Sequence, residues 1–292
     1  MSIFKGVATA LITPFKDNKI DYVSMGKLVE WQIEEEIDAL VVCGTTGEAS
    51  TLSNKEKLQL SRFVIDLTSN RVPVLVGTGT NDTAAAIALS QEAEDAGADG
   101  LLVVTPYYNK CTEKGLVMHY EAIADSVSIP IIMYSVPSRT GVNITPNCVA
   151  KLYEHPNIAG IKEASGNISQ ICQICSYADD DFDVYSGNDD QTIPIMSIGG
   201  SGCISTVSNI IPKRYSKMVR DYNNGKHMEA GKEQVALKEL IDSMFLEVNP
   251  SPVKAALCMM GKCYMDYRLP LCPPTNKTQF IIYDVLQEYG II

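Results

Sequence analysis

The lysine at position 162 stands near the end of a run of apolar and small residues, IAGIKEASG at residues 158–166. A strand of this composition is expected to be buried on both faces, where an unpaired ammonium is energetically costly. Burial disfavours the charged form of an amine, and a neutral lysine amine attacks carbonyl groups to form a Schiff base. Lys162 is therefore a candidate nucleophile. The alternative is a structural lysine paired with a nearby carboxylate such as Glu163.

Other polar motifs also follow apolar runs: GTTGE at 44–48, TPYYNK at 105–110, YSVPSRTG at 134–141 and SGNDD at 186–190. Amides of a glycine-flanked turn such as GTTGE can hold a carboxylate. The phenol of Tyr134 can move protons during imine formation, and the planar fork of Arg139 suits a second carboxylate. Each motif alone also fits a structural role, as a turn, a core tyrosine or a surface arginine.

Eight apolar or β-branched runs must position these groups. They lie at 6–12, 39–44, 72–77, 100–106, 129–135, 158–164, 182–187 and 202–207. Amphipathic segments separate them at the spacing of βα units, which predicts an α/β fold, a (β/α)8 TIM barrel. A doubly wound open sheet is the alternative, but it usually has fewer strands, and no G-x-G-x-x-G follows the first run. In a barrel the polar motifs would gather at the carboxyl ends of the strands.

Alternation along the strand predicts which side chains point into the barrel. Ile158, Gly160 and Lys162 are expected on the inner face, and Ala159 and Ile161 on the outer face.

The last part of the chain carries three helical patterns, at about 227–247, 252–261 and 276–289. We expect a barrel catalytic domain at 1–224 and a C-terminal three-helix appendage at 225–292, packed on the barrel.

Composition narrows the class of protein. The net charge of −11 argues against nucleic acid or an anionic membrane as partner, and no apolar run approaches the length of a membrane-spanning helix. The nine cysteines are scattered in apolar contexts, which is typical of reduced thiols in a cytoplasmic protein. The CQIC motif at 172–175 is interpreted as two cysteines on a helix face. The three histidines are far apart in sequence, so no metal site is expected.

Several motifs together resemble one enzyme family. GTTGE, TPYYNK, YSVPSRTG, GIKEASGN and SGNDD, with NPSPVK at 249–254 and RLPLCPP at 268–274, are similar to the motifs of dihydrodipicolinate synthases. These are pyruvate-dependent class I aldolases, grouped with N-acetylneuraminate lyase. The resemblance covers nearly the whole chain and has the motifs in the same order.

The resemblance implies catalytic roles. Lys162 would form the imine with pyruvate, and Tyr134 would be the general acid and base. Thr46 and Tyr108 would complete a proton relay with Tyr134. Tyr108 would come from a neighbouring subunit of a tight dimer, two of which would form a homotetramer.

It also implies substrate contacts. Amides of Thr45 and Thr46 would hold the carboxylate of pyruvate, and Arg139 would bind that of aspartate 4-semialdehyde. Carbonyl groups of Gly187 and Ile204 would line the pocket. The product would be 4-hydroxy-tetrahydrodipicolinate, at the entry to lysine and diaminopimelate synthesis. Neither a metal nor an organic cofactor would be needed, because the protonated imine of Lys162 accepts the electrons.

Two other functions remain open. One is a sister aldolase acting on a sugar acid, in which the arginine position usually carries another residue. The other is a barrel that has lost catalysis and serves as a binding or regulatory protein. The intact set of Lys162, Tyr134, Thr46 and Tyr108 argues against that loss.

The sequence departs from lysine-inhibited members of the family. In those members a carboxylate at the position of Ala85 holds the ligand's amine, and histidines occupy the positions of Asn54 and Lys57. Here Asn81 and Tyr107 match, but Ala85 cannot hold a cation and Lys57 adds a like charge. Because an unpaired ammonium loses hydration when buried, we expect an enzyme insensitive to millimolar lysine.

Overall fold

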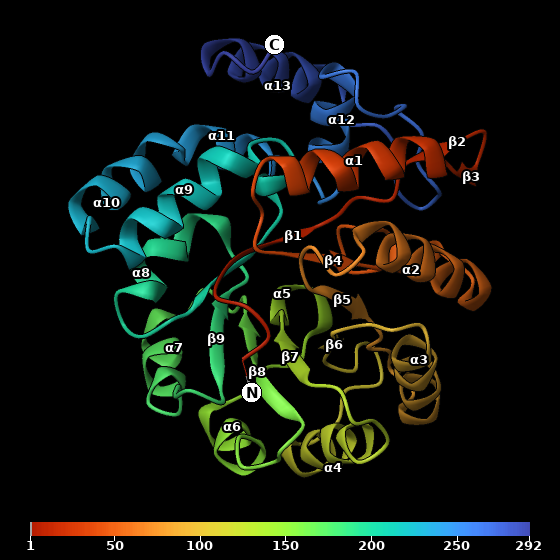
Figure 1. Cartoon of the computed structure of the whole chain (residues 1–292), viewed down its shortest axis with the longest axis vertical. Coiled ribbons are helices and arrows are strands. Elements are labelled where there is room, and N and C mark those ends of the chain that lie inside the picture. Colours follow the sequence, from red (N-terminus) through yellow and green to blue (C-terminus); the bar gives the residue numbers. More distant parts are fainter. Residues whose placement is uncertain (1) are drawn as a thin grey trace.

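The computed structural model describes residues 2–292, in which eight parallel strands close into a barrel (Figure 1). The strands are β1 (Gly6–Ala10), β4 (Ala39–Val42), β5 (Val74–Gly77), β6 (Gly100–Val104), β7 (Ile131–Ser135), β8 (Ile158–Glu163), β9 (Asp183–Ser186) and β10 (Gly202–Ser205). Each lies inside a predicted run, and β1 closes the barrel by pairing with both β10 and β4. The predicted (β/α)8 barrel is confirmed, and the open-sheet alternative is wrong.

Helices surround the strands (Figure 1). They are α1 (Tyr22–Glu34), α2 (Asn54–Thr68), α3 (Thr83–Asp95), α4 (Glu113–Ala124), α5 (Pro137–Thr140), α6 (Pro146–Leu152), α7 (Ile168–Cys175), α8 (Thr192–Met196) and α9 (Pro212–Asn223). Polar side chains cap most of the longer ones. In α2, for example, Ser53 and Glu56 form a capping box, which satisfies two amides that the first helical turn leaves unpaired.

A small hairpin follows β1 and was not predicted. It consists of β2 (Phe15–Lys16) and β3 (Lys19–Ile20), joined by Asp17 and Asn18, whose φ angles are 52° and 61°. Two consecutive residues with positive φ are typical of a tight hairpin turn, in which Asp and Asn are favoured. The strands are too short for an alternating pattern to reveal them.

Apolar side chains form two layers, one inside the barrel and one between the strands and the surrounding helices. The inner layer contains Ile132 and Tyr134, and the outer layer contains Ile131 and Met133. Alternation therefore holds along β7, so that the Tyr134 side chain points inward.

The predicted alternation fails at the start of β8. Ile158 was expected on the face of Lys162, but it packs in the outer layer with Ile161. The pairing of β7 with β8 shifts register here, because Ile131 pairs with Ile158 and Ile132 pairs with Gly160. Because β8 has one extra residue at this point, the residues before it point to the opposite face from the one that strict alternation predicts.

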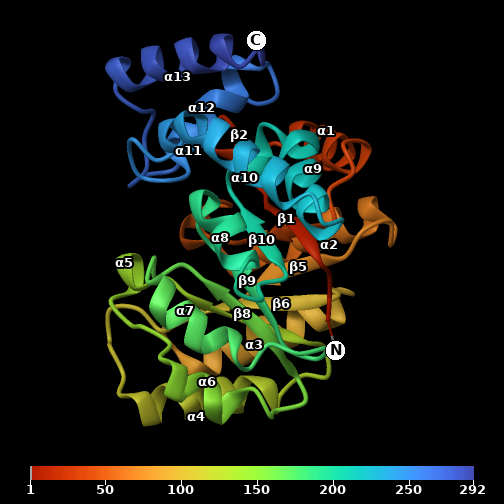
Figure 2. The same cartoon turned by 90° about the vertical axis from the view of Figure 1, so that its left-hand side faces the viewer.

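The C-terminal segment contains α10 (His227–Ala236), α11 (Lys238–Ser243), α12 (Ser251–Met259) and α13 (Asn276–Glu288). The first predicted helix is interrupted at Leu237, so four helices occupy the segment where three were predicted. Helix α10 packs on α9 and α8 of the barrel, whereas α11 and α12 pack on α13. Figure 2 shows these helices stacked along one side of the barrel. The domain division at residue 224 stays a prediction.

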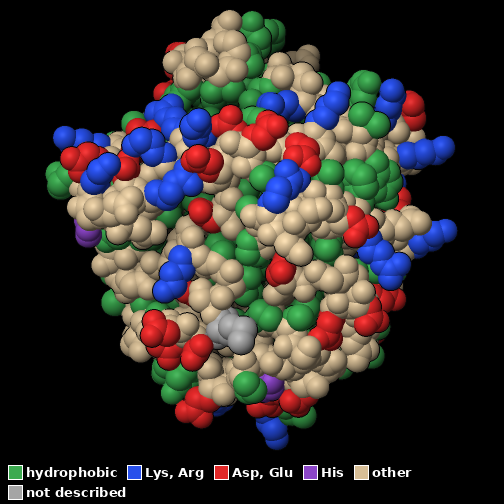
Figure 3. Space-filling view, in the orientation of Figure 1, with side chains coloured by type: hydrophobic (Ala, Val, Ile, Leu, Met, Phe, Trp, Pro, Cys, Tyr) green, Lys and Arg blue, Asp and Glu red, His purple; other side chains and the backbone are tan. Residues whose placement is uncertain are grey.

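The surface carries mixed charge. On the face in Figure 3, Lys and Arg side chains of the upper half alternate with Asp and Glu side chains. Nucleic acid binds to a continuous basic surface. The described residues form no such surface on this face. Within residues 2–292, every helix is too short or too polar to cross a bilayer.

Candidate active site

Lys162 and Tyr134 face each other inside the barrel. They are register partners on β8 and β7, and the Lys162 side chain is 6% exposed. Its Nζ lies 4.4 Å from the centre of the Tyr134 ring, a distance at which an aromatic ring attracts a cation. The side chains predicted as nucleophile and acid/base are thus neighbours on adjacent strands, and their catalytic roles stay predictions.

Glu163 is not the partner of Lys162. Its carboxylate accepts hydrogen bonds from the amide of Ser165 at 2.6 Å and from Nε2 of Gln170 at 3.1 Å. Burial raises the pKa of this carboxyl group, although these hydrogen bonds oppose the shift. The structural alternative, in which Glu163 neutralises Lys162, is therefore wrong.

Gly187 and Ile204 border the same interior. A Cβ atom at Gly187 would lie 3.1 Å from Cε of Lys162 and 2.7 Å from Cβ of Ala164, so only glycine leaves room for the lysine. Ile204 on β10 is 1% exposed and packs in the inner layer with Tyr134.

The GTTGE turn after β4 has a strained backbone. Cys43 before it and Glu48 at its end have φ angles of 57° and 55°, a left-handed conformation that costs energy for residues other than glycine. Thr13 donates a hydrogen bond to the carbonyl of Gly47 at 2.6 Å and helps to hold the turn. Such strain is frequent where a backbone is shaped for binding.

Two amides of the turn are available to a ligand. The amides of Gly47 and Glu48 donate to the carbonyls of Gly44 and Thr45, each at 3.1 Å. The amides of Thr45 and Thr46 donate to no acceptor within residues 2–292. Because Thr45 also lines a cavity, this arrangement suits the predicted carboxylate.

Asn249 connects two predicted residues that lie far from it in sequence. Its Nδ2 donates to Oγ1 of Thr46 at 3.0 Å, and its main-chain carbonyl accepts from Nη2 of Arg139 at 3.1 Å. Oγ1 of Thr46 also lies 3.4 Å from Oγ1 of Thr206. The sequence indicates the motif NPSPVK but not a role for Asn249 within it.

A buried ion pair ties the same motif to the GTTGE turn. Nζ of Lys254 lies 2.6 Å from Oε1 of Glu48, and both side chains are fully buried. Burial is the largest influence on both groups, since it lowers the pKa of Lys254 and raises that of Glu48. The amine also lies 4.1 Å from the centre of the Phe15 ring.

Asp189, in the SGNDD motif, was also missed as a site residue. Its buried carboxylate accepts hydrogen bonds from Oγ of Ser205 and from the amides of Thr206 and Val207. Burial raises its pKa, while these bonds and the charge of Lys162 act in the opposite direction. The carboxylate thus shapes the turn after β10, next to Ile204.

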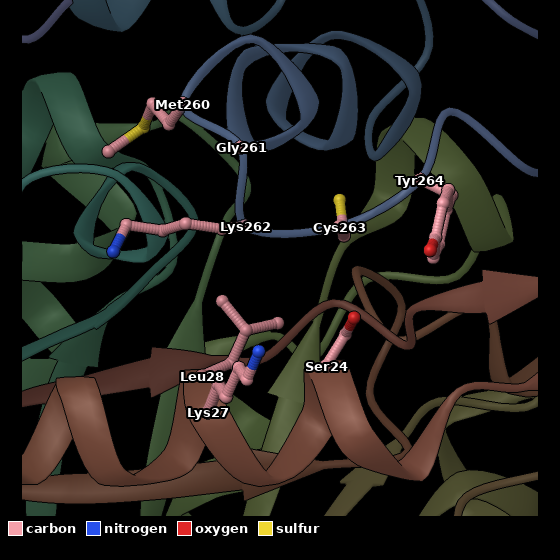
Figure 4. A pocket seen from close by; sticks show the side chains of 8 residues that line it. All are labelled: Ser24, Lys27, Leu28, Met260, Gly261, Lys262, Cys263 and Tyr264. Carbon is pink, nitrogen blue, oxygen red and sulfur yellow. The ribbon is translucent and has the colours of Figure 1, made fainter.

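A cavity of about 330 Å³ opens beside these groups, and its wall includes Thr45, Lys57, Tyr107, Tyr134 and Arg139. Lys162 does not line this cavity, but its amine lies against the ring of Tyr134, which does. A larger hollow of about 540 Å³ lies elsewhere, between α1 and residues 260–264 (Figure 4). Lys262 in that hollow places its amine 3.5 Å from the centre of the Trp31 ring. None of the predicted site residues lines it, so size alone does not locate the site.

Tyr108 stands apart from the site of its own chain. Its side chain is 91% exposed, and its φ of 70° is left-handed. The amides of Asn109 and Lys110 donate to the carbonyls of Tyr107 and Tyr108, which makes two tight consecutive turns. The structure therefore brings together the other predicted residues but not Tyr108.

CQIC lies in α7 as expected, with Cys172 exposed and Cys175 buried, and both thiols are free. No three His, Cys, Asp or Glu side chains within residues 2–292 are placed to hold a metal ion.

The sequence matches the model of the Dihydrodipicolinate synthetase family over residues 3–289. The chain belongs to this family. It is 50% identical to the 4-hydroxy-tetrahydrodipicolinate synthase of Caldicellulosiruptor saccharolyticus over 292 residues, which cover 100% of this chain and 99% of that one.

Solved structures of the family have the same fold. The dihydrodipicolinate synthase of Thermotoga maritima matches with a TM-score of 0.98 and 42% identity, over 99% of this chain and 100% of that one. The enzyme of Cyanidioschyzon merolae, solved with lysine bound, matches with a TM-score of 0.97 and 34% identity over 100% of both chains.

The predicted difference from lysine-inhibited family members concerns α2 and α3. Ala85 lies in the first turn of α3, Asn54 begins α2, and Lys57 follows one turn later. Lys57 shares the wall of the cavity with Tyr107. Nothing in this arrangement tests the expected insensitivity to lysine, which stays a prediction.

Proposed function

We propose that this chain is a 4-hydroxy-tetrahydrodipicolinate synthase, a lyase of the class I aldolase type. It condenses pyruvate with L-aspartate 4-semialdehyde in the first committed step of diaminopimelate and lysine synthesis. The buried contact of Lys162 with Tyr134, in a chain of this family, carries the proposal. Arg139 in the cavity wall favours the synthase over a sister aldolase for sugar acids.

The first step joins pyruvate to Lys162. The neutral amine attacks the carbonyl carbon of pyruvate, and loss of water leaves a protonated imine. Amides of Thr45 and Thr46 hold the carboxylate of pyruvate, since neither amide has an acceptor within residues 2–292. Tyr134 supplies and removes protons, because its ring lies against the reacting amine.

The second step forms the carbon–carbon bond. The protonated imine withdraws electrons, so the methyl group of pyruvate loses a proton to give an enamine. The enamine attacks the aldehyde carbon of the semialdehyde, whose oxygen takes up a proton, while Arg139 holds its carboxylate. The amino group of the second substrate then attacks the imine carbon, which closes the ring and frees Lys162. In this scheme the imine is the electron sink, and neither a metal nor an organic cofactor is required.

The proposal includes the assembly. Tyr108 is solvent-exposed in its own chain, as expected for a residue that completes the relay of a neighbour. We therefore propose a tight dimer, two of which form a homotetramer, and a cytoplasmic location. Carbonyls of Gly187 and Ile204 line the pocket in this scheme, and Thr46 links Tyr134 to the partner subunit's Tyr108.

Reduction with borohydride in the presence of pyruvate should attach one pyruvyl group per chain, at Lys162. The expected result follows from the formation of an imine that borohydride reduces to a stable amine. Peptide mass spectrometry locates the label. Lys162→Ala should lose both labelling and product formation. The control Lys27→Ala, at an exposed position on α1, should keep both. A label at another lysine, or normal turnover without Lys162, would refute the mechanism.

Mixing Tyr108→Phe with Lys162→Ala should restore activity. In a hybrid dimer one site combines an intact Lys162 with an intact Tyr108, so random mixing should give about a quarter of the wild-type rate. The measurement is product formation before and after the subunits exchange, with each variant alone as control. No gain after proven exchange would mean that Tyr108 serves its own chain.

A further inference from the structure

We propose that Asn249 is a positioning residue that directs the hydroxyl proton of Thr46 into the proton relay with Tyr134. The inference rests on the proposed function and adds a residue from the C-terminal segment to the site. It makes the segment between α11 and α12 part of the machinery that prepares the relay.

The contact between Asn249 and Thr46 has a direction. An amide NH2 group donates hydrogen bonds and does not accept them. When Nδ2 of Asn249 donates to Oγ1 of Thr46 at 3.0 Å, it occupies a lone pair of that oxygen. The hydroxyl proton must then point elsewhere, and in this proposal it points toward Tyr134.

Burial makes this contact selective. Asn249 is 7% exposed and Thr46 is 3% exposed, so bulk water does not compete for the hydroxyl group. The other hydrogen-bonding neighbour of Oγ1 is the hydroxyl of Thr206, at 3.4 Å. That longer contact can accept or donate, so it does not decide the direction by itself.

The other end of the amide is free of protein contacts. Oδ1 of Asn249 is buried and has no hydrogen-bond donor within residues 2–292. A substitution that changes the amide to a carboxylate therefore alters mainly the contact with Thr46. The carboxylate accepts only, so it would draw the Thr46 proton away from the relay.

The main chain of Asn249 separates this effect from substrate binding. Its carbonyl accepts from Nη2 of Arg139 at 3.1 Å, and side-chain substitution leaves that group in place. The buried pair of Lys254 with Glu48 holds the same segment against the turn. Loss of the amide should therefore lower kcat and spare the KM for the semialdehyde.

Asn249→Asp tests the proposal through pH. Above the pKa of the new carboxyl group we expect kcat to fall about 10-fold to 100-fold, with the semialdehyde KM within about twofold of wild type. That loss lies at or below the lower end of what a directly acting acid or base contributes, as expected for a residue that acts through Thr46. As the pH falls, the acid gains a proton that it can donate to Thr46. The ratio of variant to wild-type kcat should then rise toward acid pH. A ratio that does not change with pH, or a loss confined to KM, overturns the proposal.

The matched control is Asn276→Asp, which adds the same charge at the exposed start of α13. Its kcat ratio should stay close to one at every pH. Borohydride trapping tests the proposed function separately from the role of Asn249. Wild type and Asn249→Asp should both be labelled at Lys162, because imine formation does not need this amide. Failure to label wild type would refute the proposed function. Labelling together with a flat ratio would refute only the role of Asn249.

A second pair of variants decides the question if Asn249→Asp does not fold. Asn249→Ala should lower kcat in the wild-type background. In the Thr46→Val background, Asn249→Ala should alter kcat by less than about twofold, because valine lacks the hydroxyl group that Asn249 orients. Independent, multiplicative losses in the two backgrounds would overturn the proposal.

Discussion

Lys254→Met should lower the free energy of unfolding by about 3 to 5 kcal/mol, because it leaves Glu48 as an unpaired carboxylate in a fully buried position. Glu48→Gln should cost a similar amount by isolating the ammonium of Lys254. The double variant should recover much of the loss, since neither charge then remains buried. Denaturant unfolding measures each value.

The surface pair of Lys238 with Asp242 is the matched control. Its atoms are also 2.6 Å apart, but its side chains are 54% and 55% exposed. Lys238→Met should cost less than about 1 kcal/mol, because water screens the exposed pair. Similar losses at the two sites would contradict the argument from burial.

The two single variants should respond to pH with opposite signs. In Lys254→Met, burial keeps the pKa of Glu48 above its unfolded value of 4.5, so stability is lost as the pH rises through the folded pKa. In Glu48→Gln, burial keeps the pKa of Lys254 below its unfolded value of 10.5, so stability grows as the pH rises toward that value. Curves of the same sign would contradict this assignment of charge.

Arg139→Ala should reduce the stabilisation of the transition state, measured as kcat/KM for the semialdehyde, by about 2 to 4 kcal/mol. This is the loss expected for a charge-assisted, bidentate contact. The pyruvate KM should change little, because the GTTGE turn holds that carboxylate in our scheme. Arg139→Lys should give an intermediate loss, since it keeps the charge without the planar fork. Steady-state kinetics with each substrate varied in turn measures kcat/KM for the semialdehyde and the KM for pyruvate.

An exposed arginine provides the control for this experiment. Arg62→Ala on α2 removes the same charge from the surface and should leave both substrates unaffected. Equal losses for pyruvate and semialdehyde in Arg139→Ala would mean that Arg139 stabilises the site as a whole. Its contact with the carbonyl of Asn249 makes that outcome a real alternative.

The barrel could be predicted from sequence because both faces of its strands are buried, which leaves uninterrupted apolar runs. The errors lie where that signal stops. The extra residue near Ile158 depends on how β8 pairs with β7, and pairing register is not a local property of one strand. The interruption at Leu237 has no proline or glycine to mark it, and residues on both sides favour a helix.

The site divides in the same way. That Lys162 and Tyr134 lie close together could be predicted because a barrel brings the carboxyl ends of its strands to one rim. Asn249 lies 203 residues from Thr46, and Lys254 lies 206 residues from Glu48. No spacing rule connects such pairs. They meet because the C-terminal helices pack against the barrel, and the sequence marks only the motif that contains them.

The buried pair between Glu48 and Lys254 has a consequence for the order in which the protein becomes active. The ribosome makes the chain from its N-terminus, so the GTTGE turn emerges long before Lys254. A nascent chain that has completed all eight strands still lacks the cation that neutralises Glu48 and the amide that meets Thr46. The site is therefore completed only when the last quarter of the chain has folded onto the barrel. A truncated product with all eight strands would lack both Asn249 and Lys254.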